Sequence, residues 1–283
     1  MRRPFQKRHK RVDRSFGASF HARIIKDDSL KDNYPLFCEG AYLRYPSGNT
    51  TNLYNTITGV AEGNEDETDN MTLEKLGELS ALVRAKGIVL GINMKQSTTE
   101  ITDMLAEASL HFTVTHVELG NELYFKTWTE FASSAAYVTK CDAVITAIRA
   151  IPAYDDVKIG AVALGKAEDG GTRDDWNSTV AGLDADVDAF IYHLYKREGE
   201  SVENRISRMT SRLIPSENEI WITEYGSEYD DIEKDYVTFR NYFARNFAIH
   251  IPYALVNFNS ARFAFIKKEN GTITDIGNYW LNN

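Results

Sequence analysis

Two glutamates draw attention because each ends a short apolar run and precedes residues that turn the chain. Glu122 closes the run His-Val-Glu-Leu-Gly-Asn-Glu at 116–122, and Glu224 follows Ile-Trp-Ile-Thr at 220–223. A strand that ends in a carboxylate delivers that group to the edge of a sheet. Two carboxylates across a cleft can cleave a glycosidic bond if one donates a proton while the other attacks the sugar. We therefore predict Glu122 and Glu224 as a catalytic pair.

Other side chains at the ends of strand-like runs suit the same chemistry. An arginine next to one carboxylate favours its ionised form, and partial burial of the other favours its neutral form. Tyrosine and asparagine side chains supply hydrogen bonds to hydroxyl groups, and a tyrosine ring offers a flat face to a sugar. The predicted substrate-binding residues are Arg44, Asn121, His193, Tyr195, Tyr225 and Asn257.

Strand-like runs and helical patterns alternate along the chain. The predicted strands span 15–25, 41–45, 88–94, 116–122, 157–164, 188–195, 219–224 and 253–259. The predicted helices span 72–86, 97–110, 127–150, 174–182, 201–213 and 232–250, with a final helical turn at 276–281. Strands separated by helices indicate βαβ units and a parallel sheet. Eight such units predict an α/β protein with a (β/α)8 TIM barrel, whose active site lies at the C-terminal ends of the strands.

The main rival is a doubly wound open sheet, which carries a glycine-rich phosphate loop after its first strand. Here the corresponding stretch reads GASFHAR and matches no such loop. We find no repeat or linker that would divide the chain, so we predict a single barrel domain over residues 15–283. Residues 1–14 are expected to form a basic, poorly ordered segment. Two serine or threonine residues followed three positions later by glutamate, Ser97 with Glu100 and Thr127 with Glu130, predict helix starts.

The charge and hydrophobicity of the chain disfavour some classes of binding partner. The 283 residues have a formal net charge of −9, although residues 1–14 hold seven Lys or Arg residues and one acidic residue. An acidic body argues against nucleic acid as the main ligand, because phosphate contacts dominate such binding. No apolar run reaches the length of a membrane-spanning helix, and the basic segment has no apolar stretch of a secretory signal behind it. The cellular location and the oligomeric state stay open.

Cofactor signals are weak. The histidines show no HExxH-type spacing, so we expect no metal and no other cofactor. The two cysteines, Cys38 and Cys141, form no disulfide framework, although a single bridge between them is compatible with the sequence.

The two glutamate motifs, Leu119-Gly120-Asn121-Glu122 and Thr223-Glu224-Tyr225-Gly226, resemble those of clan A glycoside hydrolases, which are retaining (β/α)8 enzymes. The sequence Glu-Leu-Gly-Asn-Glu is most similar to the corresponding motif of the branch that contains heparanase and the β-glucuronidases of family 79. The α-L-arabinofuranosidases of family 51 are nearby. The run Leu-Arg-Tyr-Pro-Ser-Gly at 43–48 is similar to the second-strand motif of that branch. The resemblance covers about residues 40–260.

This resemblance implies a role for each matching residue. Glu122 would be the acid/base on strand four, Glu224 the nucleophile on strand seven, and Asn121 a ligand of the sugar 2-hydroxyl. Tyr195 or His193 would hold Glu224, and Arg44 would lie beneath it. The chain departs from the family at strand eight, where Asn-Phe-Asn at 257–259 replaces a frequent tryptophan. It also has no room for the complete accessory β-sandwich of families 51 and 79.

Several residues allow a purely structural interpretation. Glu118 shares a strand face with Glu122, so we expect it to point into the barrel and bind Arg44 or His116. Trp128 and Trp176 follow strand ends and fit either a sugar platform or packing. The acidic stretches at 62–69 and 228–235 would disfavour a strongly anionic substrate if they rim the mouth.

Three functions remain in competition. The first is a retaining glycoside hydrolase acting on an oligo- or polysaccharide. The second is a non-catalytic carbohydrate-binding barrel derived from such an enzyme. The third, a metal- or phosphate-using barrel enzyme, lacks its ligand motifs. The sequence leaves the sugar, its anomer and endo or exo cutting undetermined.

Overall fold

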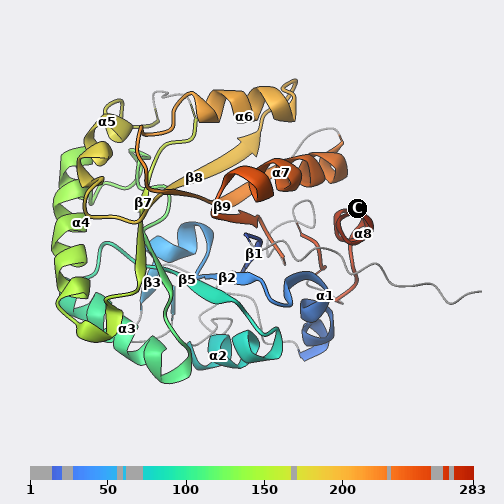
Figure 1. Ribbon diagram of the computed structural model, residues 1–283, viewed down its shortest axis with the longest axis horizontal. Helices are drawn as coiled ribbons and strands as arrows, with labels where there is room; N and C mark the ends of the chain where they lie inside the picture. Colours follow the sequence, from blue (N-terminus) through green and yellow to red (C-terminus); the bar gives the residue numbers. More distant parts are fainter. Residues whose placement is uncertain are drawn as a thin grey trace, which may run out of the picture.

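The computed structural model describes residues 15–20, 28–55, 60–61, 73–166, 171–227, 231–255, 264–267 and 271–283. Eight parallel strands form one sheet in the order of the chain, and helices surround it (Figure 1). The strands are β1 (Gly17–Ser19), β2 (Tyr42–Tyr45), β5 (Gly87–Gly91), β6 (His116–Leu119), β7 (Lys158–Val162), β8 (Ala189–Lys196), β9 (Glu219–Ser227) and β10 (Ile249–Pro252). A parallel bridge between Phe16 and His250 joins the two edges. The predicted (β/α)8 barrel is confirmed.

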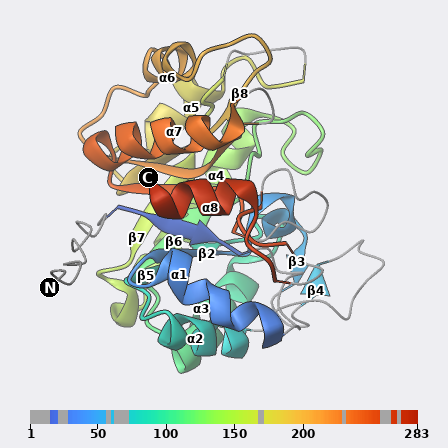
Figure 2. The same cartoon turned by 90° about the vertical axis from the view of Figure 1, so that its right-hand side faces the viewer.

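Helices follow the strands and cover the outer face of the barrel. They are α1 (Tyr34–Cys38), α2 (Leu73–Leu82), α3 (Thr98–His111), α4 (Ser134–Arg149), α5 (Trp176–Val180), α6 (Val202–Thr210), α7 (Ile232–Asn246) and α8 (Asp275–Asn282). Short 3₁₀ helices lie at Asp28–Asn33, Gly48–Asn52, Pro152–Tyr154 and Ala181–Leu183, and β3 (Tyr54–Asn55) pairs with β4 (Val60–Ala61) as a small antiparallel ribbon. In Figure 2, α8 lies between α7 and α1 and so completes the ring.

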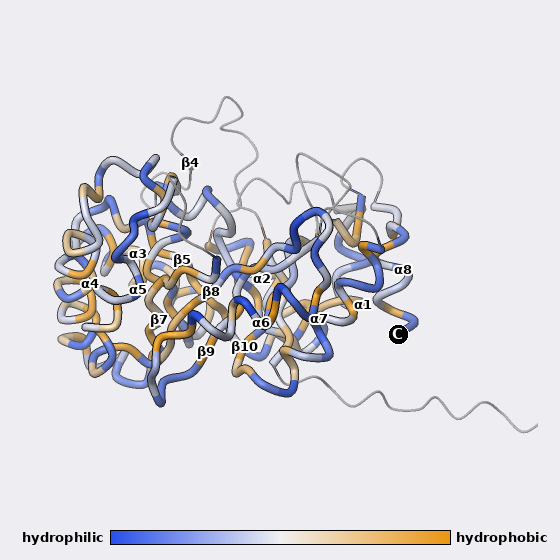
Figure 3. The backbone as a smooth tube through the Cα atoms, turned by 90° about the horizontal axis from the view of Figure 1, so that it is seen from above, coloured by the Kyte–Doolittle hydropathy of each residue, from blue (hydrophilic) through white to orange (hydrophobic). Residues whose placement is uncertain are grey.

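The hydrophobic core has two layers because alternate strand residues face opposite sides. The outward-facing residues of the strands pack against the helices in one large cluster. The inward-facing residues form a smaller cluster that includes Tyr42, Val89, Ile191, Trp221 and Ile249. The strands at the centre of Figure 3 are correspondingly hydrophobic. This inner layer closes the lower barrel and supports the residues one layer above it.

A β-bulge decides which residues of β9 face the interior. Ile191 of β8 pairs with Trp221, but His193 pairs with Glu224, so β9 holds one extra residue between these points. Without that residue, strict alternation from Trp221 would turn Tyr225 inward and Glu224 outward. The bulge reverses the two, which is a common use of bulges beside active sites.

The helix starts test the capping predictions. At α3, the side chain of Ser97 accepts from the backbone of Glu100, and the Glu100 side chain accepts from the backbone of Ser97, so this capping box is confirmed. The prediction for Thr127 and Glu130 is wrong. The chain makes turns there, and α4 begins only after Ser133, whose side chain caps the helix.

The last strand was predicted in the wrong place. β10 is Ile249–Pro252, whereas the sequence analysis ended a long helix at residue 250 and began the strand at residue 253. Helix α7 instead ends at Asn246, because Phe247 adopts an extended backbone conformation. Asn257 lies outside the described residues, as do residues 1–14 and the acidic stretch at 62–69.

Candidate active site

The Gly-Asn-Glu turn after β6 has an unusual backbone. Gly120 has φ +89° and Glu122 has φ +46°, both in the left-handed region. The positive φ of Gly120 favours glycine, and a Cβ there would also lie 2.4 Å from a methyl carbon of Leu123, which would have to move. Non-glycine residues in this region cost about 1–3 kcal/mol and concentrate at functional sites. The turn therefore imposes strain that places the Glu122 side chain at the barrel mouth.

Asn121 is held from both sides. Its backbone N–H donates to Oδ1 of Asn52 over 3.0 Å, and its carbonyl accepts from Nδ2 of Asn52. Its side-chain Oδ1 accepts from Arg44 over 2.8 Å. Asn121 is 1% exposed, so its side chain lies in the floor of the site.

Arg44 is the centre of that floor. Its side chain is fully buried, and it donates to both oxygens of Glu118 over 2.7 and 2.8 Å. Its Nη1 donates a hydrogen bond to Oε2 of Glu224 over 2.8 Å. Burial alone would lower the pKa of Arg44, but the charges of Glu118 and Glu224 outweigh it and raise the pKa. Arg44 thus lies beneath Glu224, and its burial leaves it to orient that carboxylate rather than to touch a ligand.

Glu118 is the partner that balances Arg44. The expectation that it points inward and binds Arg44 is confirmed, and Thr223 also donates to it over 3.0 Å. Burial would raise the pKa of Glu118, but Arg44 and His193 lower it to about 2. Glu118 is therefore a permanently ionised, structural carboxylate.

Glu224 has both oxygens engaged. Arg44 donates to Oε2 and the Tyr195 hydroxyl donates to Oε1, so the carboxylate cannot rotate freely. Its side chain is only 7% exposed. Of the two residues expected to hold Glu224, Tyr195 makes the hydrogen bond.

Glu122 is more open, with 20% of its side chain exposed. The Tyr124 hydroxyl donates to its Oε1 over 2.6 Å. Nδ1 of His193 lies 3.3 Å from the same oxygen. Burial would raise the pKa of Glu122, but His193 and Tyr124 outweigh it and lower the pKa. This corrects the expectation that burial keeps one glutamate neutral.

His193 carries the positive charge that lowers the pKa of Glu122. Its side chain is 2% exposed and lies among three carboxylates, those of Glu118, Glu122 and Glu224. Burial would lower the pKa of His193, but the carboxylates, with Glu224 the strongest, raise it to about 9. The imidazole is therefore protonated at neutral pH, and its Nδ1 lies beside the Glu122 carboxylate.

The distances around His193 limit the separation of the two glutamates. Nδ1 lies 3.3 Å from a Glu122 oxygen and 4.0 Å from a Glu224 oxygen. The distance between this Glu122 oxygen and this Glu224 oxygen therefore cannot exceed the sum of the two distances to Nδ1. That limit concerns one pair of oxygens and is compatible with the roughly 5–5.5 Å between the carboxyl groups of retaining glycosidases.

Tyr225 is not part of this cluster. It is fully buried outside the barrel wall, where its ring packs against Phe239 and Phe243 of α7. Its hydroxyl lies 3.2 Å from Nδ1 of His250. The prediction of a substrate-binding role is wrong, because the bulge in β9 turns its neighbour Glu224 inward.

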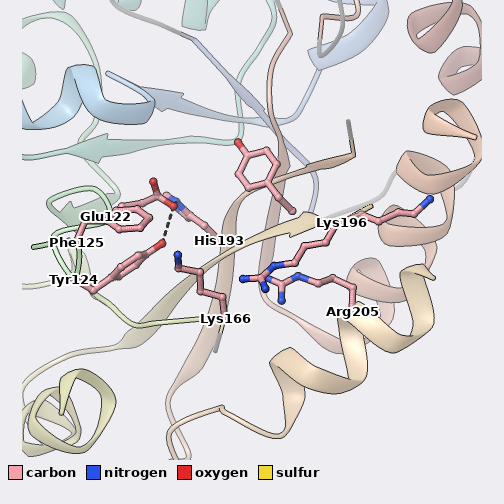
Figure 4. Close-up of a pocket in the computed structure, with 9 residues that line it drawn as sticks. Glu122, Tyr124, Phe125, Lys166, His193, Lys196 and Arg205 are labelled. Carbon is pink, nitrogen blue, oxygen red and sulfur yellow. Dashed lines mark hydrogen bonds and ion pairs between the residues drawn. The ribbon is translucent and has the colours of Figure 1, made fainter. Parts of the chain in front are cut away.

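A cavity of about 340 Å³ opens beside Glu122 (Figure 4). One side of it holds Glu122, Tyr124 and Phe125, and the other side is basic. The basic residues are Lys166, Lys196, Arg197 and Arg205. The described wall is therefore partly basic, whereas the acidic residues at 62–69 and 228–230 lie outside the described residues.

The sequence analysis missed Tyr124 and Arg205. Tyr124 stands two positions after Glu122, beyond the recognised motif. Arg205 falls within the apolar stripe of α6, together with Val202, Ile206 and Met209. A cation at helical spacing among buried residues was the available signal.

The remaining candidates serve packing. Trp176 is fully buried, and its indole N–H donates to the carbonyl of Val162 over 2.8 Å. Trp128 packs against the main core, with Lys95 over its ring. Cys38 and Cys141 are both free and buried.

Among the described residues, no group of three or more His, Cys, Asp or Glu side chains is arranged to hold a metal. No helix formed by these residues is long and apolar enough to cross a membrane.

Comparison with known proteins agrees with this picture. Residues 129–251 match the family model described as a glycosyl hydrolase catalytic core. That match, together with the fold, confirms the predicted resemblance to clan A glycoside hydrolases. No curated protein sequence matches the chain significantly.

Similar solved structures share the fold at low sequence identity. A family 51 α-L-arabinofuranosidase from Bifidobacterium longum has a TM-score of 0.67 at 14% identity, over 93% of this chain and 69% of that one. A family 128 exo-β-1,3-glucanase from Aureobasidium namibiae has a TM-score of 0.60 at 14% identity, over 95% and 96%. A family 128 endo-β-1,3-glucanase from Amycolatopsis mediterranei, in complex with laminaripentaose, has a TM-score of 0.56 at 11% identity, over 95% and 98%.

Proposed function

We propose that the chain is a retaining glycoside hydrolase in which Glu224 is the nucleophile and Glu122 the acid/base. The observation that carries the proposal is the different bonding of the two carboxylates. Glu224 is fixed on both oxygens by Arg44 and Tyr195. Glu122 is more exposed and lies beside a protonated histidine and an open cavity. An attacking group must be ionised and oriented, whereas a proton donor must reach both a proton source and solvent.

The first chemical step follows from these positions. A carboxylate oxygen of Glu224 attacks the anomeric carbon, and the bond from that carbon to the leaving oxygen breaks. The leaving oxygen takes the proton that Glu122 and His193 share. Glu224 loses its charge as it becomes an ester, and the Glu122–His193 pair becomes anionic as it gives up the proton. The net charge of the buried cluster is therefore unchanged, which avoids a large electrostatic cost in a low-dielectric site.

The second step reverses the roles. Glu122, now unprotonated, takes a proton from a water molecule, which attacks the anomeric carbon of the glycosyl ester. Glu224 leaves as a carboxylate, again bonded by Arg44 and Tyr195, and the proton returns to the Glu122–His193 pair. The product keeps the anomeric configuration of the substrate.

The substrate class is a carbohydrate. Support comes from the catalytic-core match over residues 129–251 and from the shared fold with glycosidases, one of them in complex with laminaripentaose. A screen of aryl glycosides and polysaccharides for hydrolysis would identify the sugar that this chain accepts.

The test compares Glu224→Ala with Glu122→Ala on an activated aryl glycoside found in that screen. Glu224→Ala should lose on the order of 10⁴-fold or more in kcat, because the covalent step is gone. Glu122→Ala should lose about 10²- to 10⁴-fold on poor leaving groups and far less on good ones, which need no proton. Added azide should rescue both, giving an azide product of opposite anomeric configuration in the two variants.

The control is Glu203→Ala, which removes an exposed carboxylate from α6 and should keep full activity. Thermal unfolding of all three variants checks that they fold. Full activity in a folded Glu224→Ala or Glu122→Ala variant would refute the proposal. Carbohydrate binding without hydrolysis by the wild type would instead favour a non-catalytic barrel.

A further inference from the structure

Arg205 lies in the wall of the cavity beside Glu122, yet no described residue makes a hydrogen bond or an ion pair with its guanidinium. The residue is on α6 and is 4% exposed. Among the described residues, no hydrogen bond or ion pair reaches its guanidinium, and its Nε is buried without an acceptor. In Figure 4 the guanidinium points toward the cavity, on the side opposite Glu122 and Tyr124.

The surrounding charges compensate it only in part. Burial is the largest influence on Arg205 and lowers its pKa, while the charge of Glu200 raises that pKa and the charge of Arg197, which lines the same cavity, lowers it. The carboxylate of Glu200 ion-pairs with Arg208 over 3.1 Å and makes no hydrogen bond to Arg205. Lys196 lines the cavity too, but it ion-pairs with Asp235 over 2.7 Å. Arg205 is thus a buried cation beside other cations.

Such an arrangement is unfavourable without an anion. A buried charge keeps its ionised form only when a partner replaces the lost water, and a bare one destabilises the fold. An apolar residue would fit the stripe of α6 formed by Val202, Ile206 and Met209 at no such cost. The guanidinium instead points toward a ligand-sized space, and its N–H donors match the oxygens of an acidic group.

We propose that this cavity is an anion-binding subsite that takes an acidic substituent on the leaving-group side of the substrate. The inference rests on the proposed function, because Glu122 as acid/base marks the side from which the leaving group departs. Glu122 lines the cavity, whereas Glu224, the nucleophile, does not. Arg205 is the main ligand of the anion, and Lys166 and Arg197 add positive charge.

The acidic group is a carboxylate or a sulfate ester. Both present oxygens that a guanidinium can bind by two parallel hydrogen bonds. A planar carboxylate belongs to uronic acids and a tetrahedral sulfate to sulfated sugars. The test uses both so that the two sources are told apart.

The first arm measures binding without catalysis. Sodium glucuronate and sodium sulfate are titrated into the wild type, with sodium chloride at equal ionic strength as reference. A ligand at about ten times its Kd should raise the Tm by about 2–4 °C. The rise should disappear in Arg205→Met and persist in the matched control Arg208→Met, whose arginine lies on the same helix but is 66% exposed.

The second arm measures hydrolysis. Aryl glycosides of the sugar that the wild type accepts carry an aglycone with a carboxylate or a sulfonate, each paired with its neutral carboxamide or sulfonamide. Arg205→Met should lower kcat/KM on the acidic member by about 10- to 100-fold and on the neutral member by less than about 3-fold. Arg208→Met should change neither.

The stability of Arg205→Met separates a ligand role from a structural one. Removing an unpaired buried charge should leave the Tm without ligand unchanged or raise it. A large fall in Tm, equal losses on acidic and neutral substrates, or an anion-induced rise that survives Arg205→Met would overturn the inference. If the wild type hydrolyses no glycoside, the proposed function fails, while the titration still decides whether Arg205 binds anions.

Discussion

Two buried arginines lie within the same barrel mouth and differ in their surroundings. Arg44, on β2, bonds Glu118, Glu224 and Asn121, so each nitrogen of its guanidinium has an acceptor. Arg205, on α6, is almost as deeply buried and has no such partner among the described residues. The first charge is satisfied within the fold and positions a carboxylate. The second remains available to a ligand.

The difference shows that burial alone does not reveal whether a charged side chain stabilises the fold or binds a ligand. A buried charge with complete pairing belongs to the architecture of the site, and its removal damages the fold. A buried charge without pairing stabilises nothing in the free protein, so its function has to be sought in a complex. The comparison predicts opposite outcomes for the same substitution at the two positions.

The largest effect is expected for Arg44→Met. The change leaves Glu118 and Glu224 buried without their cation, which should destabilise the protein by about 3–5 kcal/mol. Activity should fall at least about 100-fold, because Glu224 loses one of its two orienting donors. Denaturant unfolding and kcat/KM measure both effects, with Arg205→Met as the comparison. Equal stability of the two variants would contradict the distinction between the arginines.

A smaller effect is expected for Tyr195→Phe, which removes the hydrogen bond to Oε1 of Glu224. A hydrogen bond to a charged group contributes roughly 1.5–3 kcal/mol, so kcat/KM should fall by about 10- to 100-fold while the Tm changes little. Tyr242→Phe, on the outer helix α7, is the matched control and should keep full activity. Unchanged kinetics in Tyr195→Phe would show that Arg44 orients Glu224 alone.

The smallest effect concerns pH. The pKa of His193 is raised from 6.5 to about 9 in the folded protein, so the protonated imidazole stabilises the fold. That contribution is complete below pH 6.5, decreases as the pH rises and is lost above about 9. The Tm of the wild type should therefore fall more steeply between pH 6.5 and 9 than that of His193→Gln.

Activity follows the same proton. The Glu122–His193 pair should lose its shared proton near pH 9, which sets the alkaline limb of kcat/KM. In His193→Gln, Glu122 must hold the proton alone, so the limb should move to lower pH. An alkaline limb at the same pH in both proteins would show that His193 does not hold the proton.

Much of the barrel was predictable from the sequence. The alternation of apolar runs with helical patterns led to the (β/α)8 fold, and seven of the eight predicted strands overlap β1 to β9 of the main sheet. Glu122 and Glu224 were found because each follows an apolar strand on which local pattern and position agree. The inward direction of Glu118 followed from simple alternation with Glu122.

The failures have local physical causes. The bulge in β9 is a matter of pairing with β8, so the sequence could not tell that Glu224 faces inward and Tyr225 outward. The strand β10 was missed because Ile-His-Ile-Pro continues the apolar pattern that ends α7. The pKa of Glu122 depends on His193, a residue 71 positions away in the sequence, which only the fold brings within 3.3 Å.

The most direct test of the account is the identity of the residue that becomes glycosylated. The wild type is incubated with a panel of activated 2-deoxy-2-fluoroglycosides, which slow breakdown of the covalent intermediate, and the intact mass and peptide map are recorded. We predict the addition of one fluoroglycosyl group per chain, on Glu224, and none in Glu224→Gln. An adduct on another carboxylate, or hydrolysis of a natural substrate with inversion and no adduct, would contradict the assignment of Glu224 as the nucleophile.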